Sequence, residues 1–244
     1  MKKTFYITII SVLLTIPAIV LSAVDSQTVA INKFELIWSA DTYTPYNYQG
    51  RNLPVAGSKI TVDAVVTASG GNAKDLKYSW FLEDFFQQNK SGYGKNSFYF
   101  YAQQSPGAYH TVRLQIFNED RTIFEEKTIQ IPMVSPEIVF YSSSGNSHFS
   151  NQASTTSIVF ADKNFSFVAK PYFFSIKKLT DLVFEWTLSG TKPVISSDYN
   201  ASVFNLTISG KTSNEILESS LLVNVKNPKD DRQKAFGSMK INIY

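Results

Sequence analysis

Two segments of this sequence repeat one pattern of large apolar residues at alternate positions, 106 residues apart. Alternation with a period of two is typical of a β-strand that buries one face. Each copy therefore predicts a strand with a tryptophan at the centre of a core. The residues on the repeated face are Leu76, Tyr78, Trp80 and Leu82 in the first copy, and Leu182, Phe184, Trp186 and Leu188 in the second.

The alternating segments on either side of these strands also correspond between the two copies. The matching segments are 34–38 and 137–141, 60–64 and 165–169, 98–100 and 203–208, 112–116 and 221–225, and 129–131 and 239–243. About seven short strands around a buried tryptophan, in roughly 100 residues, are typical of an immunoglobulin-like sandwich. We therefore predict an all-β protein of two tandem immunoglobulin-like antiparallel β-sandwich domains, at residues 30–133 and 136–244. The prolines between them, at 132 and 136, predict a short, stiff link.

The first copy resembles the PKD family of extracellular β-sandwiches. The resemblance rests on WFLED at 80–84, PGAY at 106–109 and VRLQIFN at 112–118. Two features depart from the family's pattern, because the glycine-rich acidic turn is missing and Tyr109 lies one residue out of phase with Val112. The resemblance implies PKD domains, and a neighbouring immunoglobulin-like family is the alternative.

A second resemblance concerns the location of the protein. WSADTYTPYNYQG at 38–50, with SGYGK at 91–95, is similar to uncharacterised exported proteins of bacteria. Together the two resemblances imply tandem PKD or immunoglobulin-like domains of an exported bacterial surface protein. Such modules act mostly as spacers and as adhesion or binding units on cell surfaces and secreted enzymes.

Residues 1–23 have the pattern of a secretory signal peptide. Two lysines follow Met1, apolar residues dominate up to Leu21, and small residues end the segment. Val20 and Ser22 suit the positions that precede a cleavage site. The alternative is an uncleaved membrane anchor at residues 5–23, because the apolar run approaches the roughly 20 residues that span a bilayer. Both interpretations export the rest of the chain, as a secreted or a cell-surface protein.

Charge and cysteine content narrow the classes of partner. Removal of residues 1–22 deletes two lysines and no acid, which leaves 21 basic and 20 acidic residues. A nearly neutral chain has no general attraction for nucleic acid or for an anionic membrane. We therefore expect no nucleic-acid partner, and membrane contact only through an uncleaved N-terminal segment. The chain has no cysteine, so burial of apolar residues must stabilise it without disulfides.

The stretch SGYGKNS at residues 91–97 has the composition of a phosphate-binding loop but lacks its spacing. A P-loop requires a glycine five positions before the Gly-Lys pair and a Ser or Thr after the lysine. Here those positions hold Asn89 and Asn96, and the next segment alternates like a strand instead of beginning a helix. The glycines instead predict a connection between strands that uses positive φ angles.

No constellation of titratable residues predicts an enzyme, a metal site or a cofactor. His110 and His148 lie in different copies, and we expect both at the surface. The acids occur as neighbouring pairs in turns, whereas glycosidases need carboxylates that face each other across a sugar. Some sandwiches bind calcium through acid-rich loops, for which Glu83 with Asp84 and Asp230 with Asp231 are the candidates, but neither pair has the alternating spacing of a calcium loop. The pairs are Glu83 and Asp84, Glu119 and Asp120, Glu125 and Glu126, and Asp230 and Asp231.

One insertion is rich in aromatic residues. Tyr43, Tyr46 and Tyr48 surround a proline, and Arg51 follows closely. Exposed tyrosines beside Asn and Arg favour a ligand-binding surface for a glycan or a protein. The other interpretation is that the insertion folds over its own sandwich and buries its rings, and we prefer this one to the ligand-binding surface.

The sequence leaves three functions open. The first is a non-enzymatic exported module for adhesion, scaffolding or binding of an unknown protein or glycan at the cell surface. The second is a subunit or accessory protein of a surface appendage or secretion assembly, joined through strand edges. The third is a carbohydrate-binding or metal-dependent component of a secreted enzyme, against which the scarce histidines and scattered acids argue.

Overall fold

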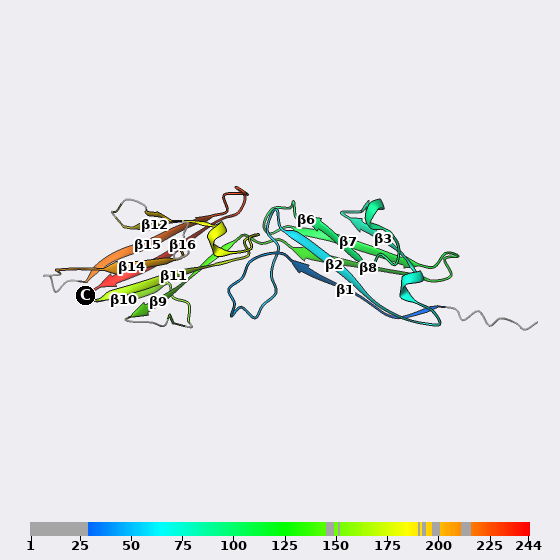
Figure 1. Ribbon diagram of the computed structural model, residues 1–244, viewed down its shortest axis with the longest axis horizontal. Helices are drawn as coiled ribbons and strands as arrows, with labels where there is room; N and C mark the ends of the chain where they lie inside the picture. Colours follow the sequence, from blue (N-terminus) through cyan, green and yellow to red (C-terminus); the bar gives the residue numbers. More distant parts are fainter. Residues whose placement is uncertain are drawn as a thin grey trace, which may run out of the picture.

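The protein is all-β and consists of two immunoglobulin-like sandwiches that lie end to end (Figure 1). The computed structural model describes residues 29–144, 149–150, 152–189, 191, 194–196, 201–210 and 216–244. The expected signal peptide or anchor and His148 lie outside the described residues. Within the described part of the chain, no helix is long and apolar enough to cross a membrane.

Strands β1 to β8 form the first sandwich. They are β1 (Ala30–Ala40), β2 (Lys59–Ser69), β3 (Lys77–Leu82), β4 (Phe85–Phe86), β5 (Gly92–Tyr93), β6 (Ser97–Tyr101), β7 (Tyr109–Phe117) and β8 (Phe124–Pro132), with short 3-10 helices η1 (Ala73–Asp75) and η2 (Gln88–Lys90). One sheet has the order β1-β2-β6, and the other has the order β4-β3-β7-β8 with β5 also paired to β3. All of these strand pairs are antiparallel.

Strands β9 to β16 form the second sandwich. They are β9 (Glu137–Ser144), β10 (Thr156–Val159), β11 (Asn164–Tyr172), β12 (Val183–Leu188), β13 (Val194–Ser196), β14 (Val203–Thr207), β15 (Leu217–Lys226) and β16 (Lys234–Ile243), with the 3-10 helix η3 (Leu179–Asp181). The sheets have the orders β14-β11-β9 and β10-β16-β15-β12-β13. Within this sandwich, β10 pairs with β16 in parallel, and the other pairs are antiparallel.

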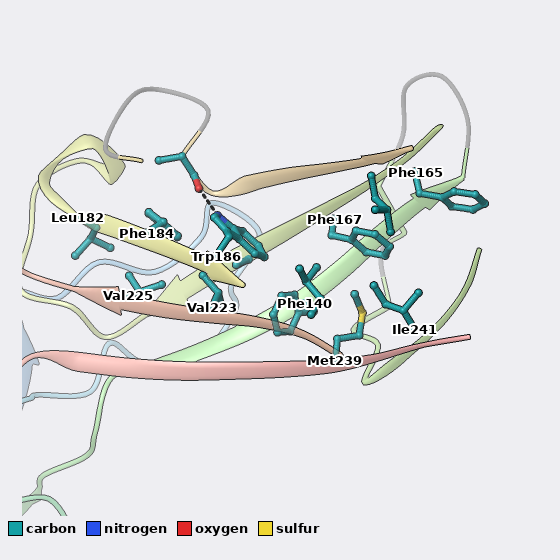
Figure 2. Close-up of a cluster of buried hydrophobic side chains, with 14 of the residues drawn as sticks. Phe140, Phe165, Phe167, Leu182, Phe184, Trp186, Val223, Val225, Met239 and Ile241 are labelled. Atoms are coloured by element: carbon teal, nitrogen blue, oxygen red, sulfur yellow. Dashed lines mark hydrogen bonds between the residues drawn. The ribbon is translucent and has the colours of Figure 1, made fainter. Parts of the chain in front are cut away.

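Each sandwich has its own core around the predicted tryptophan. The exposed fraction is 0% for Trp80 and 2% for Trp186. Each indole Nε1–H donates to a backbone carbonyl 15 residues later, at 2.8 Å, on Lys95 and Ala201 respectively. Each indole also lies 5.4 Å, between ring centroids, from a phenylalanine of the opposite sheet, Phe98 or Phe204. The two cores are separate clusters with equivalent centres, and Figure 2 shows the second.

Two of the row pairs predicted to correspond between the two copies are fully buried in both. They are Ile60, Val62 and Ala64 with Phe165, Phe167 and Ala169, and Val112, Leu114 and Ile116 with Leu221, Val223 and Val225. Pairing of β3 with β7 and of β12 with β15 brings the second set of rows beside the tryptophan strands, whereas the first set lies on the opposite sheets. The prediction of tandem immunoglobulin-like sandwiches is therefore confirmed.

The SGYGKNS stretch contains the short strand β5 and, at 94–96, its connection to β6, which uses a positive φ angle as the glycines predict. Gly94 has a φ of 65°, which a side chain at this position would strain. The Ser91 hydroxyl accepts from the backbone N–H of Trp80 at 2.9 Å. The Lys95 side chain donates to the carbonyl of Asn89 at 3.0 Å. The stretch therefore supports the strand that carries Trp80.

The expectation of a surface histidine is wrong for His110, which is only 3% exposed. Its Nδ1 lies 2.8 Å from Oε1 of Glu83. Its Nε2 accepts from the backbone N–H groups of Gln103 at 3.2 Å and Gln104 at 3.4 Å. Since Nε2 accepts, Nδ1 carries the proton and donates it to the carboxylate. The ring is buried because both of its nitrogens have partners inside the fold.

Candidate binding surface at the domain junction

Residues 41–58 connect β1 to β2 and reach from the first sandwich to the second, as Figure 1 shows in blue. In the second sandwich the equivalent connection, between β9 and β11, contains β10, which covers the edge of β16. In the first sandwich the connection at 41–58 forms no such strand. Near the end of β8 it makes one backbone hydrogen bond, in which the Val134 N–H donates to the Pro54 carbonyl at 3.0 Å. Other residues of this connection contact the second sandwich instead, among them Tyr43, Tyr48 and Ala56.

The connection holds its own shape through polar contacts. The Thr42 hydroxyl donates to the Leu53 carbonyl at 3.0 Å, and the Asn52 amide donates to the Thr42 carbonyl at 2.7 Å. The Tyr48 N–H donates to the Pro45 carbonyl at 2.9 Å. These bonds tie the two ends of the insertion together and give its tyrosines fixed positions.

Tyr43 forms an isolated antiparallel bridge to the second sandwich. Its N–H donates to the Phe174 carbonyl, and its carbonyl accepts from the Phe173 N–H, both at 2.7 Å. Both phenylalanines are buried, and Phe173 has a φ of 64°. The first sandwich thus adds a short piece of backbone to the edge just beyond the end of β11.

A cleft of about 380 Å³ lies beside this bridge. Along β11, β14 stops pairing at Val168, and one more bond joins the Ala169 N–H to the Ser202 carbonyl. Backbone N–H groups of alternate residues point to the same side of a strand, so the nitrogen of Pro171 points to the same edge of β11 as the N–H of Ala169. Proline has no N–H to donate there. The edge is therefore open between Ser202 and Tyr43. The cleft is lined by Tyr43, Pro45, Tyr46, Asn47, Val168, Ala169, Lys170, Pro171, Leu179 and Ser202.

Tyrosines from both sandwiches meet next to the cleft. The Tyr48 ring contacts Tyr172 edge-on, with centroids 5.5 Å apart, and the hydroxyls of Tyr172 and Tyr141 are 3.4 Å apart. Burial, and then the bond to Tyr141, raise the pKa of Tyr172 far above its usual value. Burial also raises the pKa of Tyr43. These hydroxyls therefore stay protonated at physiological pH. The Lys170 ammonium lies 4.2 Å from the Tyr141 ring centroid and supplies a positive charge at the cleft.

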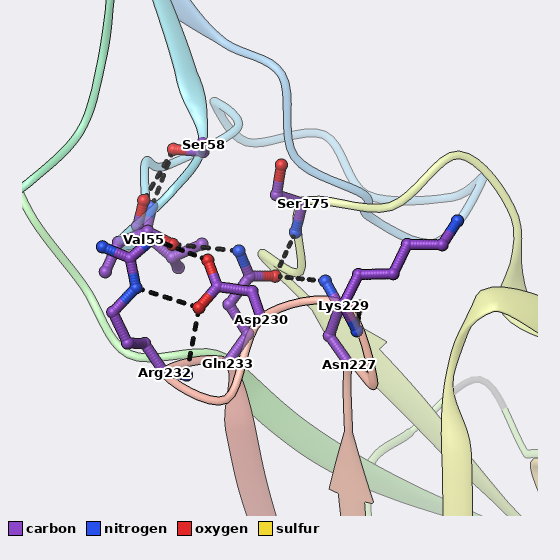
Figure 3. A network of polar contacts seen from close by, with 9 residues as sticks. Val55, Ser58, Ser175, Asn227, Lys229, Asp230, Arg232 and Gln233 are labelled. Atoms are coloured by element: carbon purple, nitrogen blue, oxygen red, sulfur yellow. Dashed lines mark hydrogen bonds and ion pairs between the residues drawn. The ribbon is translucent and has the colours of Figure 1, made fainter.

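A buried glutamine forms the polar side of the junction, which Figure 3 shows. Gln233 is 1% exposed, and its Nε2 donates to the Ala56 carbonyl of the first sandwich at 2.9 Å. Its Oε1 accepts from the Ser175 N–H at 2.9 Å and from the Asn227 amide at 3.1 Å. The Gln233 side chain thus bonds the β15–β16 turn of the second sandwich to Ala56 of the first and to Ser175 of its own. Both the amide nitrogen and the amide oxygen of Gln233 have partners.

The same turn packs closely against the first sandwich. Arg232 donates to both carboxylate oxygens of Asp230, at 2.9 and 2.8 Å. Those bonds hold the pKa of Asp230 below its usual value. A Cβ atom on Gly57 would lie 2.2 Å from Asp230 Oδ2, so glycine permits this approach.

The four predicted site residues fall into different environments. Tyr43 and Tyr48 are half-buried, Tyr46 is fully exposed, and the Arg51 guanidinium lies 4.6 Å from the Trp38 ring centroid. Tyr43 and Tyr46 line the cleft, whereas Tyr48 and Arg51 do not. The expected burial is therefore partly correct for Tyr43 and Tyr48 and wrong for Tyr46, and the two tyrosines pack against the second sandwich rather than their own.

Sequence reasoning missed every residue that the second sandwich contributes to this surface. The buried pair at 173–174, directly after β11, was the available signal, because two phenylalanines beyond a strand end need a partner. Val168, Lys170 and Ser202 gave no signal, since strand pairing alone brings them to the cleft.

The described residues contain no group of three or more His, Cys, Asp or Glu placed to hold a metal ion. Of the acid pairs, Glu83 and Asp84 form the tight turn between β3 and β4, with φ of 50° and 64°. Asp230 is paired with Arg232 at the junction. These acids have structural partners in the fold.

Solved structures resemble this chain over most of its length. The three N-terminal domains of the bacteriophage RB49 outer capsid protein Hoc are 13% identical, with a TM-score of 0.46, covering 88% of this chain and 59% of that one. The four N-terminal Ig domains of Dscam1 are 12% identical, with a TM-score of 0.31, covering 84% and 46%. Domains FN1–FN3 of chicken CNTN1 are 9% identical, with a TM-score of 0.31, covering 79% and 64%.

This chain therefore spans less than two thirds of each of these three structures. At such identities the likeness concerns the fold alone. No protein-family model matches the sequence, and a search of characterised proteins finds no match.

Proposed function

We propose that this chain is an exported, non-enzymatic binding module that holds a protein or glycan partner at the cell surface. The observation that carries the proposal is the junction cleft, where the exposed ring of Tyr46 lies beside a mostly apolar hollow. Ligand sites are typically concave and apolar, with a few polar groups that orient the ligand. Asn47, Lys170 and Ser202 supply such groups here.

Export rests on the pattern of residues 1–23, and PKD membership rests on the resemblance at residues 80–118. Repeated sandwiches with a fixed junction suit a spacer that presents a surface away from the cell. Mass spectrometry of the mature N-terminus distinguishes a cleaved signal peptide from a retained anchor.

The test compares Tyr46→Ser with wild type in binding to glycan arrays and to host or neighbouring cells. Since Tyr46 is exposed, we expect unchanged thermal stability and a loss of binding of about tenfold or more, as for a central aromatic contact. Tyr101→Ser is the matched control, because Tyr101 is also exposed but lies on β6 of the first sandwich. Equal binding of every array glycan and every cell type by wild type and Tyr46→Ser would contradict the proposal.

A further inference from the structure

A second surface lies on the outer face of the second sandwich, on strands β12, β15 and β16. Glu185 lies directly opposite Asn224, which lies directly opposite Phe236, so the three side chains form a row across the sheet. In the next row Lys226 lies opposite Lys234. These five residues line a groove of about 360 Å³, and the Phe236 ring is 60% exposed.

The polar side chains of this groove have no partners among the described residues. No hydrogen bond or ion pair within that part of the chain involves the side chains of Glu185, Asn224, Lys226 or Lys234. By contrast, Lys240 on the same strand as Lys234 bonds to Glu218 at 2.6 Å. A carboxylate, an amide and two ammonium groups thus line the groove, and each is able to hydrogen-bond a ligand.

The lysine pair indicates the charge of that ligand. Like charges directly opposite each other on neighbouring strands destabilise a sheet. Here Lys226 and Lys234 take such positions, and Glu185 is the one acid that lines the groove. An anionic group bound between the two ammonium groups would relieve their repulsion.

We propose that this groove binds an acidic sugar residue of an anionic glycan. The exposed Phe236 ring offers a flat apolar face to the C–H face of a sugar ring. Asn224 and Glu185, in line with that ring, bind the sugar hydroxyls, since an amide donates and accepts whereas a carboxylate accepts. Lys226 and Lys234 bind the sugar carboxylate.

The row of groups favours a sugar over an acidic peptide or a phosphate polymer. A polyphosphate or an acidic peptide such as poly-glutamate has no hydroxyl-bearing ring beside its anionic groups for Glu185 and Phe236 to contact. A uronate has one carboxylate on a ring with several hydroxyls, which matches one cationic pair beside one carboxylate, one amide and one aromatic ring.

The experiment titrates the intact protein by calorimetry with oligosaccharides of galacturonate, glucuronate-containing hyaluronan and alginate. Their carboxyl methyl esters and poly-glutamate serve as comparison ligands. We expect binding to at least one uronate, weaker binding at higher salt, and at least about tenfold weaker binding of its methyl ester. The proposal is overturned by no binding to any uronate, by equal binding of the ester, or by tighter binding of poly-glutamate.

Variants assign the binding to the groove. Phe236→Ser and Lys234→Gln should each weaken uronate binding by about tenfold. The controls are Phe124→Ser, which removes an exposed ring on β8, and Lys240→Gln, which removes a charge from the same strand outside the groove. Unchanged binding by both groove variants would overturn the assignment. Tyr46→Ser should leave uronate binding unchanged, so this site and the junction cleft fail or succeed separately.

Discussion

At the scale of single residues, the tryptophans combine apolar burial with a satisfied polar group. Each indole fills the space between two sheets, and its N–H donates to a backbone carbonyl in the segment just before the next strand of the opposite sheet, at Lys95 or Ala201. Burial of an indole N–H without a partner would cost much of the gain from the ring. In both copies the acceptor carbonyl follows the tryptophan by 15 residues. This shared hydrogen bond fixes the position of the indole in each core, in a chain that has no disulfide.

Replacement of either tryptophan by alanine should therefore destabilise its sandwich strongly. We expect Trp80→Ala and Trp186→Ala each to lower the free energy of unfolding by about 3–5 kcal/mol, because each leaves a large cavity. Urea unfolding monitored by circular dichroism measures the change. Two variants that unfold near the wild-type midpoint would show that the indoles are not central to the cores.

His110 supports the first sandwich through hydrogen bonds rather than through volume alone. His110→Leu replaces the imidazole by an apolar side chain of similar size. The backbone N–H groups of Gln103 and Gln104 and the Glu83 carboxylate then lose their hydrogen-bond partner. We expect a loss of about 1–3 kcal/mol in unfolding free energy. Tyr109→Leu, at the exposed neighbouring position, should change stability by less than about 0.5 kcal/mol in the same urea titration. Equal effects of the two variants would contradict this role.

At the scale of elements, alternation of side chains identified the central strands because burial of one face is a local property of the sequence. The strands around Trp80 and Trp186 follow from that pattern, and so does the correspondence of 98–100 with 203–208, the segments that place a phenylalanine beside each indole. Even the turn at Glu83 and Asp84, where the PKD pattern has glycines, falls between the expected strands.

The path of residues 41–58 could not be predicted in the same way. Their tyrosines indicated that the rings would be buried or would bind a ligand, and we expected them to pack on their own sandwich, whereas Tyr43 and Tyr48 contact the second one. That choice depends on Phe173 and Phe174, which lie more than a hundred residues further along the chain. The burial of His110 was missed for a similar reason, since its partners are the backbone of 103–104 and a turn in another hairpin.

At the scale of the whole molecule, the junction decides whether the two sandwiches behave as one rod. The described chain begins at one end of the long axis and ends at the other (Figure 1). Backbone bonds at Tyr43, ring contacts at Tyr48 and the buried Gln233 join the sandwiches on different sides of the link. Several contacts spread around a short linker resist bending more than a single contact would.

The double variant Tyr48→Ser with Gln233→Ala should therefore convert the rod into a hinged pair. It removes the edge-on contacts with Tyr172 and Phe173 and the bond to the Ala56 carbonyl, while both tryptophan cores remain intact. We expect one rigid arrangement to fit the small-angle X-ray scattering of the wild type, and the variant to require a mixture of arrangements. Tyr46→Ser, which removes an exposed ring of the same insertion, should scatter like the wild type. A double variant whose scattering superimposes on that of the wild type would show that the contacts of Tyr48 and Gln233 are not needed, and that the link at 132–136 with the Tyr43 backbone bridge is enough to hold the sandwiches in place.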